Sequence, residues 1–274
     1  MKFAAVYNLV PDSSFEETIK RIKRAGYDGI EISQPPLFEG RARPLEEKEM
    51  KGLCERARAC AEFVKKEGLE FIGFAPGYFC LSYFDDAVFE NYYRLAQALG
   101  APTLKVYGTL YDPKQGYRKQ FKENQRKLGV LLGYGEKYGV RSLLELHFGT
   151  LNESCSGAYL VCKDFDPKLI GVIPDPQNMV IAGKETWRMG LEILGSYIAY
   201  VHWKNSLFKK GADNQWEWQL CDMDEGLVNW KDFVQSLQAV GFTGYLCNEY
   251  RGDTKNTPSE RYLEGDLNYM KSLL

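Results

Sequence analysis

The sequence is poor in histidine, has no paired cysteine motif and has no long apolar run. Two histidines among 274 residues exclude a site that needs several imidazoles. The seven cysteines are scattered without a CxxC pair, so neither a zinc knuckle nor a disulfide framework is indicated. A reducing, cytoplasmic setting is therefore expected. The absence of both a signal-peptide pattern and an apolar run of about 18 residues predicts no membrane partner.

The chain also lacks a strong excess of charge of either sign. It has 35 basic and 37 acidic residues, for a formal net charge of -2. This balance gives no electrostatic footprint for a nucleic acid, and none is predicted as a partner. Hydrophobic residues make up 45% of the chain, which is enough to form a substantial core.

Short β-type runs alternate with longer helical patterns along the whole chain. The expected strands are 2–8, 28–33, 69–75, 103–108, 141–147, 169–175, 197–204 and 244–250. The expected helices are 14–26, 45–67, 84–99, 117–138, 156–164, 184–194, 229–240 and 258–272. Eight strand–helix pairs at this length predict an α/β fold, a closed (β/α)₈ TIM barrel forming a single domain over 1–274. A doubly wound sheet would need a glycine-rich loop after its first strand, but "YNLVPDSSF" contains no glycine.

Polar residues stand at the ends of four consecutive expected strands. These are Glu145 with His147, then Asp175, His202 and Glu249. Active sites of such barrels lie at the carboxyl ends of the strands. Three carboxylates and one imidazole form a donor set that suits one divalent metal ion, with Mn²⁺ expected and Mg²⁺, Co²⁺ or Zn²⁺ as alternatives.

Each of these residues has an ordinary structural explanation when it is taken alone. Asp175 precedes a proline and could begin a turn. Glu145 could form an ion pair with Lys105 or Lys204, and a lone histidine in an apolar strand is more often a core residue than a ligand. The metal site is predicted because all four residues stand at the same end of adjacent strands.

Several longer segments resemble the xylose-isomerase-like barrel superfamily of sugar phosphate isomerases and epimerases. They are "RAGYDGIEIS", "ELHFG", "GVIPDPQNMV", "WRMGLEILGSYIAYVHWKN" and "GFTGYLCNEY". The resemblance implies one metal ion held by Glu145, Asp175, His202 and Glu249. It also implies a metal-dependent sugar isomerase or epimerase, in which proton abstraction next to a metal-bound carbonyl gives an enediolate and Glu145 and Glu249 act as the acid/base pair.

One position departs from the superfamily's ketose 3-epimerases. Those enzymes carry a histidine three residues after the aspartate of strand 6, and this chain has Asn178 there. The substitution makes a plain ketose epimerase less favoured. The DNA-repair nucleases of the superfamily are excluded, since their multi-metal clusters need many histidines.

His147 follows Glu145 by two residues, so strand alternation places both side chains on one face. A neutral imidazole there is a candidate general base, or it only hydrogen-bonds a substrate hydroxyl. The "ELH" segment also resembles the catalytic subunits of bacterial C-glycoside deglycosidases. That resemblance implies a lyase acting on 3-keto-glycosides, with His147 as the base of an elimination and a small β subunit as partner. A non-catalytic sugar-binding barrel is the second alternative, and otherwise a homo-oligomer is expected.

Further polar side chains are expected to bind the sugar. They are Lys204, Asn178, Arg251, Glu31 and Lys105. Lys204 could instead form a salt bridge within the site, and Glu31 could have a structural role at the rim of the barrel. Trp216 and Trp218 are candidates for stacking on a ring or an aromatic aglycone, or for a subunit contact.

Overall fold

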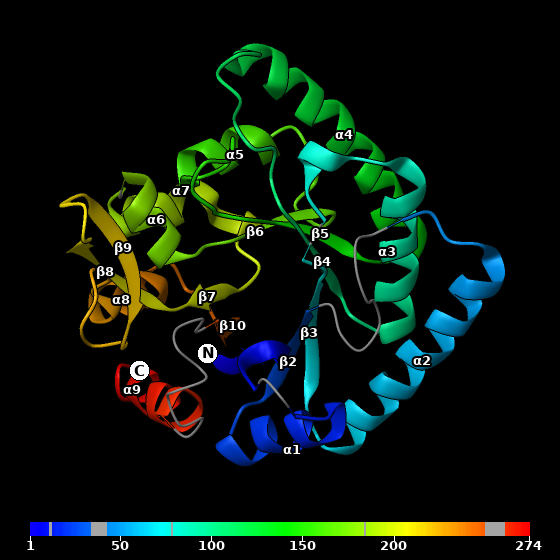
Figure 1. Ribbon diagram of the computed structural model, residues 1–274, viewed down its shortest axis with the longest axis horizontal. Coiled ribbons are helices and arrows are strands. Elements are labelled where there is room, and N and C mark those ends of the chain that lie inside the picture. Colours follow the sequence, from blue (N-terminus) through cyan, green and yellow to red (C-terminus); the bar gives the residue numbers. More distant parts are fainter. Residues whose placement is uncertain (11–12, 34–42, 78, 184, 250–260) are drawn as a thin grey trace.

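The computed structural model describes residues 1–10, 13–33, 43–77, 79–183, 185–249 and 261–274. Eight parallel strands form one sheet that curls into a ring, and helices surround it (Figure 1). In sheet order the strands are β6 (Ile170–Ile173), β5 (Arg141–Glu145), β4 (Thr103–Val106), β3 (Glu70–Ala75), β2 (Gly29–Ser33), β1 (Lys2–Val6), β10 (Tyr245–Asn248) and β7 (Val201–Trp203).

The ring is nearly closed between β6 and β7. Val172 and Ile198 form an isolated parallel bridge. The amide of Ala199 donates to the Val172 carbonyl at 2.9 Å, and the amide of His202 donates to the Pro174 carbonyl at 3.0 Å. The predicted α/β TIM-barrel fold is therefore confirmed.

The outer helices follow the predicted alternation. They are α1 (Phe15–Ala25), α2 (Glu47–Lys66), α3 (Asp86–Leu99), α4 (Tyr117–Tyr138), α5 (Cys155–Cys162), α7 (Trp187–Leu194), α8 (Trp230–Ala239) and α9 (Asp266–Ser272). The side chain of Ser14 accepts a hydrogen bond from the Glu17 amide at the start of α1, and Gly26 ends that helix at a φ of 97°. These are the cap residues that the sequence indicates.

The structure contains a helix and a hairpin that the sequence does not predict. Helix α6 (Pro176–Gly183) follows β6, and an antiparallel hairpin of β8 (Asn205–Lys210) and β9 (Trp216–Cys221) follows β7. Short turns of helix cover Tyr7–Leu9, Leu81–Tyr83, Gly195–Tyr197 and Arg261–Gly265. The helical turn Arg261–Gly265 leads directly into α9, and the expected start of the C-terminal helix lies within residues 250–260, outside the described part of the chain.

Strand alternation separates the polar interior of the barrel mouth from the apolar layer under the helices. On β7 the side chain of His202 faces the site, whereas Trp203 lies on the other face with its ring 5.5 Å from that of Phe3. Both side chains are fully buried. Among the described residues, no helix has the length and apolarity needed to cross a lipid bilayer.

Candidate metal centre

Four buried residues from neighbouring strands meet at one end of the barrel. Glu145 is the last residue of β5, Asp175 lies just beyond β6, His202 is in β7 and Glu249 follows β10. Each offers one ligand atom, and these four atoms lie within 4.8 Å of one another. None of the four side chains is more than 2% exposed. They form a buried candidate metal site.

The imidazole of His202 lies against two of the carboxylates. Its Nδ1 is 3.1 Å from Oε1 of Glu145 and 3.1 Å from Oε2 of Glu249. Burial alone would lower the pKa of His202, but Glu249 and Glu31 raise it well above its usual value. In the absence of a metal ion the ring is therefore a cation with a hydrogen on each nitrogen, and its Nδ1–H stabilises the two carboxylates.

Two lysines lie among the same carboxylates. Nζ of Lys105 is 3.2 Å from Oε2 of Glu145 and 3.4 Å from Oε1 of Glu249. Lys204 forms ion pairs with Asp175 and with Glu249, the latter at 2.6 Å. The ion pair between Glu145 and Lys105 that the sequence offered as a structural explanation is thus present, alongside the ligand geometry.

Burial raises the pKa values of the carboxyl groups, whereas the nearby lysines lower them, and the balance differs between Glu145 and Asp175. Burial would raise the pKa of Glu145, but Lys105 and His202 together outweigh it, and the pKa lies below its usual value. For Asp175 burial outweighs the attraction of Lys204, so the pKa lies above its usual value. Burial would also lower the pKa of Lys105, and Glu145 and Glu249 raise it instead.

The buried charges fit a divalent cation. Among the described residues, four carboxylates (Glu31, Glu145, Asp175 and Glu249) face two lysines (Lys105 and Lys204), which leaves two negative charges when the histidine is neutral. Uncompensated charge in a protein interior is costly. A metal ion of charge +2 would cancel the remainder, and carboxylate oxygens with one imidazole are suitable donors for it.

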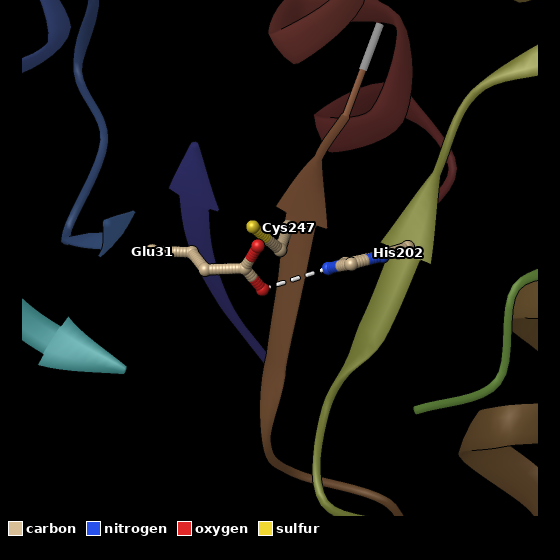
Figure 2. A group of neighbouring side chains, drawn as sticks. All are labelled: Glu31, His202 and Cys247. Carbon is tan, nitrogen blue, oxygen red and sulfur yellow. Dashed lines mark hydrogen bonds and ion pairs between the residues drawn. The ribbon is translucent and has the colours of Figure 1, made fainter. Parts of the chain in front are cut away.

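A second group shares the same histidine on its other side. Figure 2 shows Glu31 of β2 pointing at His202, with Cys247 of β10 beside them. Nε2 of His202 is 2.8 Å from Oε2 of Glu31, and the hydroxyl of Tyr200 donates to the same oxygen at 2.5 Å. Sequence reasoning missed Tyr200, although its position two residues before His202 could have placed it on the same face.

The remaining predicted site residues lie in different surroundings. Asn178 is buried on α6, where its side-chain amide donates to the Leu146 carbonyl at 3.0 Å and its backbone amide donates to Asp175. His147 is half-buried, outside the ligand group, and its Nδ1 is 3.0 Å from the Phe148 carbonyl. Arg251 lies outside the described residues.

Aromatic rings connect His147 to the β8–β9 hairpin. The ring of His147 lies 4.4 Å from that of Phe148, and Phe148 lies 5.9 Å from Trp218. Trp218 pairs across the hairpin with Phe208, and their side chains are 44% and 42% exposed. Trp216, on the same face, is 67% exposed.

Comparison with known protein families gives one match over most of the chain. Residues 19–273 match the family model described as xylose isomerase-like TIM barrel. Among curated protein sequences, none matches this chain.

Solved structures with low sequence identity share the fold over nearly the full chain. The apo form of 3-keto-D-glucoside 4-epimerase, YcjR, from E. coli has a TM-score of 0.74 at 17% identity, covering 99% of each chain. D-psicose 3-epimerase from Clostridium cellulolyticum H10, solved with D-tagatose, has a TM-score of 0.71 at 16% identity, covering 100% of this chain and 99% of its own. A xylose isomerase-like TIM barrel protein from Mycobacterium smegmatis, solved with magnesium, has a TM-score of 0.69 at 16% identity, covering 100% and 96%.

Proposed function

The chain belongs to the xylose isomerase-like TIM barrel family, and from that premise we propose that it is a divalent-metal-dependent sugar isomerase or epimerase. The observation that carries the proposal is the meeting of four buried ligand atoms, one from each of Glu145, Asp175, His202 and Glu249, within 4.8 Å of one another. The reaction is the movement of a proton at a carbon atom next to a carbonyl group.

The four residues would hold one metal ion, with Mn²⁺ expected and Mg²⁺, Co²⁺ or Zn²⁺ as alternatives. The structural neighbour from Mycobacterium smegmatis contains magnesium. A bound divalent cation polarises a carbonyl group and acidifies the neighbouring C–H bond. The buried setting strengthens that effect because little water is present to screen the charges.

The proton itself needs an acceptor and a donor supplied by the chain. Glu145 and Glu249 are the proposed pair, because both carboxylates lie at the ligand cluster and share contacts with Lys105 and His202. His147 is the proposed alternative base. Its ring lies outside the ligand group, which leaves it available for proton transfer.

We propose sugar-binding roles for five further residues, and the protein groups around each residue indicate which contacts it could make. Lys105 and Lys204 place ammonium groups beside the ligand carboxylates, where they can donate to hydroxyl or carbonyl oxygens of the substrate. Asn178 and Glu31 are already engaged with protein groups, so a contact with sugar would be shared with those bonds. Arg251 is proposed from its place after Glu249 in the sequence alone.

A second candidate function is a lyase that acts on 3-keto-glycosides, with His147 as the base of an elimination. The aromatic path from His147 through Phe148 to the exposed hairpin favours it, because a glycoside carries a group beyond the sugar ring that these rings could contact. If the protein is a lyase, we expect a small β subunit as its partner. If it is an isomerase or epimerase, we expect a homo-oligomer.

The test combines metal analysis with solvent deuterium exchange. Protein stripped with a chelator and reloaded with Mn²⁺ is incubated in D₂O with a panel of ketoses, aldoses and 3-keto-glycosides. We expect one metal ion per chain and exchange at a carbon next to the carbonyl of at least one sugar. Release of a free aglycone would identify the lyase instead.

Substitution of the ligands provides the matched comparison. Glu145→Ala, Asp175→Ala, His202→Ala and Glu249→Ala should each lose the metal ion or the exchange, while Glu136→Gln on the exposed face of α4 should lose neither. Full turnover in all four ligand variants would refute the proposed site. A metal-loaded protein that binds sugar without any exchange would instead be a sugar-binding barrel.

A further inference from the structure

The single imidazole of His202 belongs to two different groups of ligand-type atoms, one on each ring nitrogen. We propose that Glu31 is a positioning residue, which accepts a hydrogen bond from Nε2 of His202 and so leaves the lone pair of Nδ1 free to bind the metal. Tyr200 orients Glu31 by donating a hydrogen bond to it. The inference rests on the proposed metal site. It gives Glu31 a role toward the histidine in place of a contact with sugar.

The bond on the Nε2 side has a defined direction. Oε2 of Glu31 lies 2.8 Å from Nε2, and an ionised carboxylate only accepts hydrogen bonds. Oε2 of Glu31 also accepts a hydrogen bond from Tyr200, and Oε1 lies 3.8 Å from the ammonium of Lys105, so both oxygens face donors or positive charge as those of a carboxylate do. Nε2 therefore carries the hydrogen and donates it to Glu31.

Tyr200 supports the same carboxylate oxygen. Its hydroxyl lies 2.5 Å from Oε2 of Glu31 and is buried with it. The hydroxyl is the donor in this contact, because an ionised carboxylate only accepts hydrogen bonds. With two donors on one oxygen, the carboxylate has a fixed orientation toward the imidazole.

Glycine at position 73 leaves the space that this arrangement needs. A Cβ atom on Gly73 would lie 3.1 Å from the hydroxyl oxygen of Tyr200 and 2.7 Å from Oγ1 of Thr103. Both approaches are closer than a side chain normally allows. The absence of a side chain on this residue of β3 thus lets the tyrosine reach Glu31 inside the barrel.

The other nitrogen faces the ligand cluster. Nδ1 lies 3.1 Å from an oxygen of Glu145 and 3.1 Å from an oxygen of Glu249. With Nε2 occupied by its hydrogen, the neutral ring can offer a lone pair only at Nδ1. Metal-binding histidines commonly donate their other N–H to a carboxylate, which fixes the ring and increases its basicity.

Cys247 offers the competing arrangement, in which a cation would lie among Glu31, Nε2 of His202 and the thiol (Figure 2). That site would need a lone pair on Nε2 and an ionised thiolate. A buried thiolate beside the carboxylate of Glu31 would bring two negative charges together in the protein interior, which is costly. Nε2 is also already bonded to Glu31, which leaves the Nδ1 side for the metal.

The low histidine content makes a direct experiment simple. In protein labelled with ¹⁵N at histidine and loaded with Zn²⁺, long-range ¹H–¹⁵N correlation spectra contain two imidazoles, and His147→Gln assigns them. We expect His202 to show a hydrogen on Nε2 and metal at Nδ1. In Glu31→Gln we expect Zn²⁺ affinity to fall roughly 10- to 100-fold, with a smaller fall in Tyr200→Phe.

Glu70→Gln is the matched control, because Glu70 also accepts a hydrogen bond from a tyrosine, Tyr245 at 2.5 Å, but in an exposed position away from the ligand cluster. Its Zn²⁺ affinity and the His202 signals should equal those of the wild type. The comparison therefore separates an effect on the histidine from the general loss of a glutamate–tyrosine bond.

Four results would decide against the inference. Equal Zn²⁺ affinity and an unchanged His202 spectrum in Glu31→Gln would overturn the inference and leave the proposed function intact. A wild-type spectrum of the Zn²⁺-loaded protein with the His202 hydrogen on Nδ1 would do the same. A Glu31→Gln variant with an increased KM for sugar and normal metal binding would return Glu31 to the role of substrate contact. A wild-type protein that takes up no divalent metal would overturn the proposed function as well.

Discussion

Lys204 forms ion pairs with two of the residues that would hold the metal, Asp175 and Glu249. Its ammonium therefore repels a cation that enters the cluster while it stabilises the carboxylates when no cation is present. We expect Lys204→Met to bind Mn²⁺ roughly tenfold or more tightly, because unit charges a few ångströms apart in a buried site interact by several kcal/mol. Titration with Mn²⁺ under competition from a chelator measures the change.

The same variant should be less stable without metal. Removing one partner of a buried ion pair costs about 3–5 kcal/mol, and Mn²⁺ should restore much of the loss in thermal unfolding. Lys137→Met provides the control, because Lys137 and Glu90 form an ion pair at the surface with side chains 59% and 31% exposed. A Lys204→Met protein with wild-type metal affinity would show that the ammonium moves away before the cation binds.

His147 separates metal binding from proton transfer. Its ring stands outside the ligand group, against Phe148 and Tyr107. We expect His147→Ala to keep one metal ion per chain and to lose about 10²- to 10⁴-fold in turnover, the usual contribution of a general base. Elemental analysis and the deuterium-exchange rate measure the two quantities, and a retained rate would reduce His147 to a bystander.

Strand ends in the sequence were enough to indicate Glu145, Asp175, His202 and Glu249, because parallel strands bring their carboxyl ends to one rim. They could not show that Glu31 and Tyr200 meet on the far side of the imidazole. That contact depends on the register between strands far apart in the sequence. No local sequence pattern indicates this contact.

Helices and strands with caps or clear periodicity were predictable, and elements formed by local polar bonds were not. Helix α1 has Ser14 and Gly26 at its ends, and α4 ends at Gly139, as the sequence indicates. Helix α6 begins just after Asp175, whose side chain accepts a hydrogen bond from the Asn178 amide. The sequence indicates Asp175 as a ligand or the start of a turn, and it does not indicate the helix that follows this residue.

The β8–β9 hairpin carries a prediction about substrate size. Trp218 faces Phe148, whereas Gln219 lies on the opposite face of β9. If the substrate is a glycoside with an aromatic aglycone, Trp218→Ala should raise its KM roughly 2- to 10-fold, the energy of one aromatic contact. The KM of a free ketose should be unchanged.

Gln219→Ala is the control for this comparison, and steady-state kinetics with paired substrates is the measurement. An equal effect of Trp218→Ala on both substrates would mean that the aromatic face does not contact an aglycone. A change in sedimentation of Trp218→Ala would instead identify the face as a subunit contact, the alternative that the sequence offered.

The complete barrel brings residues of the first and last thirds of the chain to one site, since β1 lies between β2 and β10. The alternation of eight strands with eight helices predicted a closed barrel, because few other folds accommodate that alternation in a chain of this length. The single-domain boundary and the oligomeric state stay predictions. Both depend on surfaces that a repeating pattern of strands and helices does not specify.

Asp266, the first residue of α9, makes the stability of the protein depend on pH. Its side chain is 5% exposed, and Oδ2 has no hydrogen-bond partner among the residues that the structure describes. Burial and the nearby Asp222 raise its pKa to about 7. An unfolded aspartate has a pKa of about 3.9, so between about pH 4 and pH 7 the folded chain holds a proton that the unfolded chain has released.

The contribution of Asp266 to the free energy of unfolding should therefore be fully present below about pH 4 and be lost as the pH rises through about 7. The loss is at most about 4 kcal/mol, because one pKa unit corresponds to about 1.4 kcal/mol. Asp266→Asn should remove this slope and unfold at higher denaturant concentration than the wild type at pH 8. Asp164→Asn, at an exposed site after α5, should keep the wild-type slope. Denaturant unfolding of metal-saturated protein from pH 5 to pH 8 measures the difference, and parallel curves for wild type and Asp266→Asn would mean that the buried carboxyl finds a compensating partner.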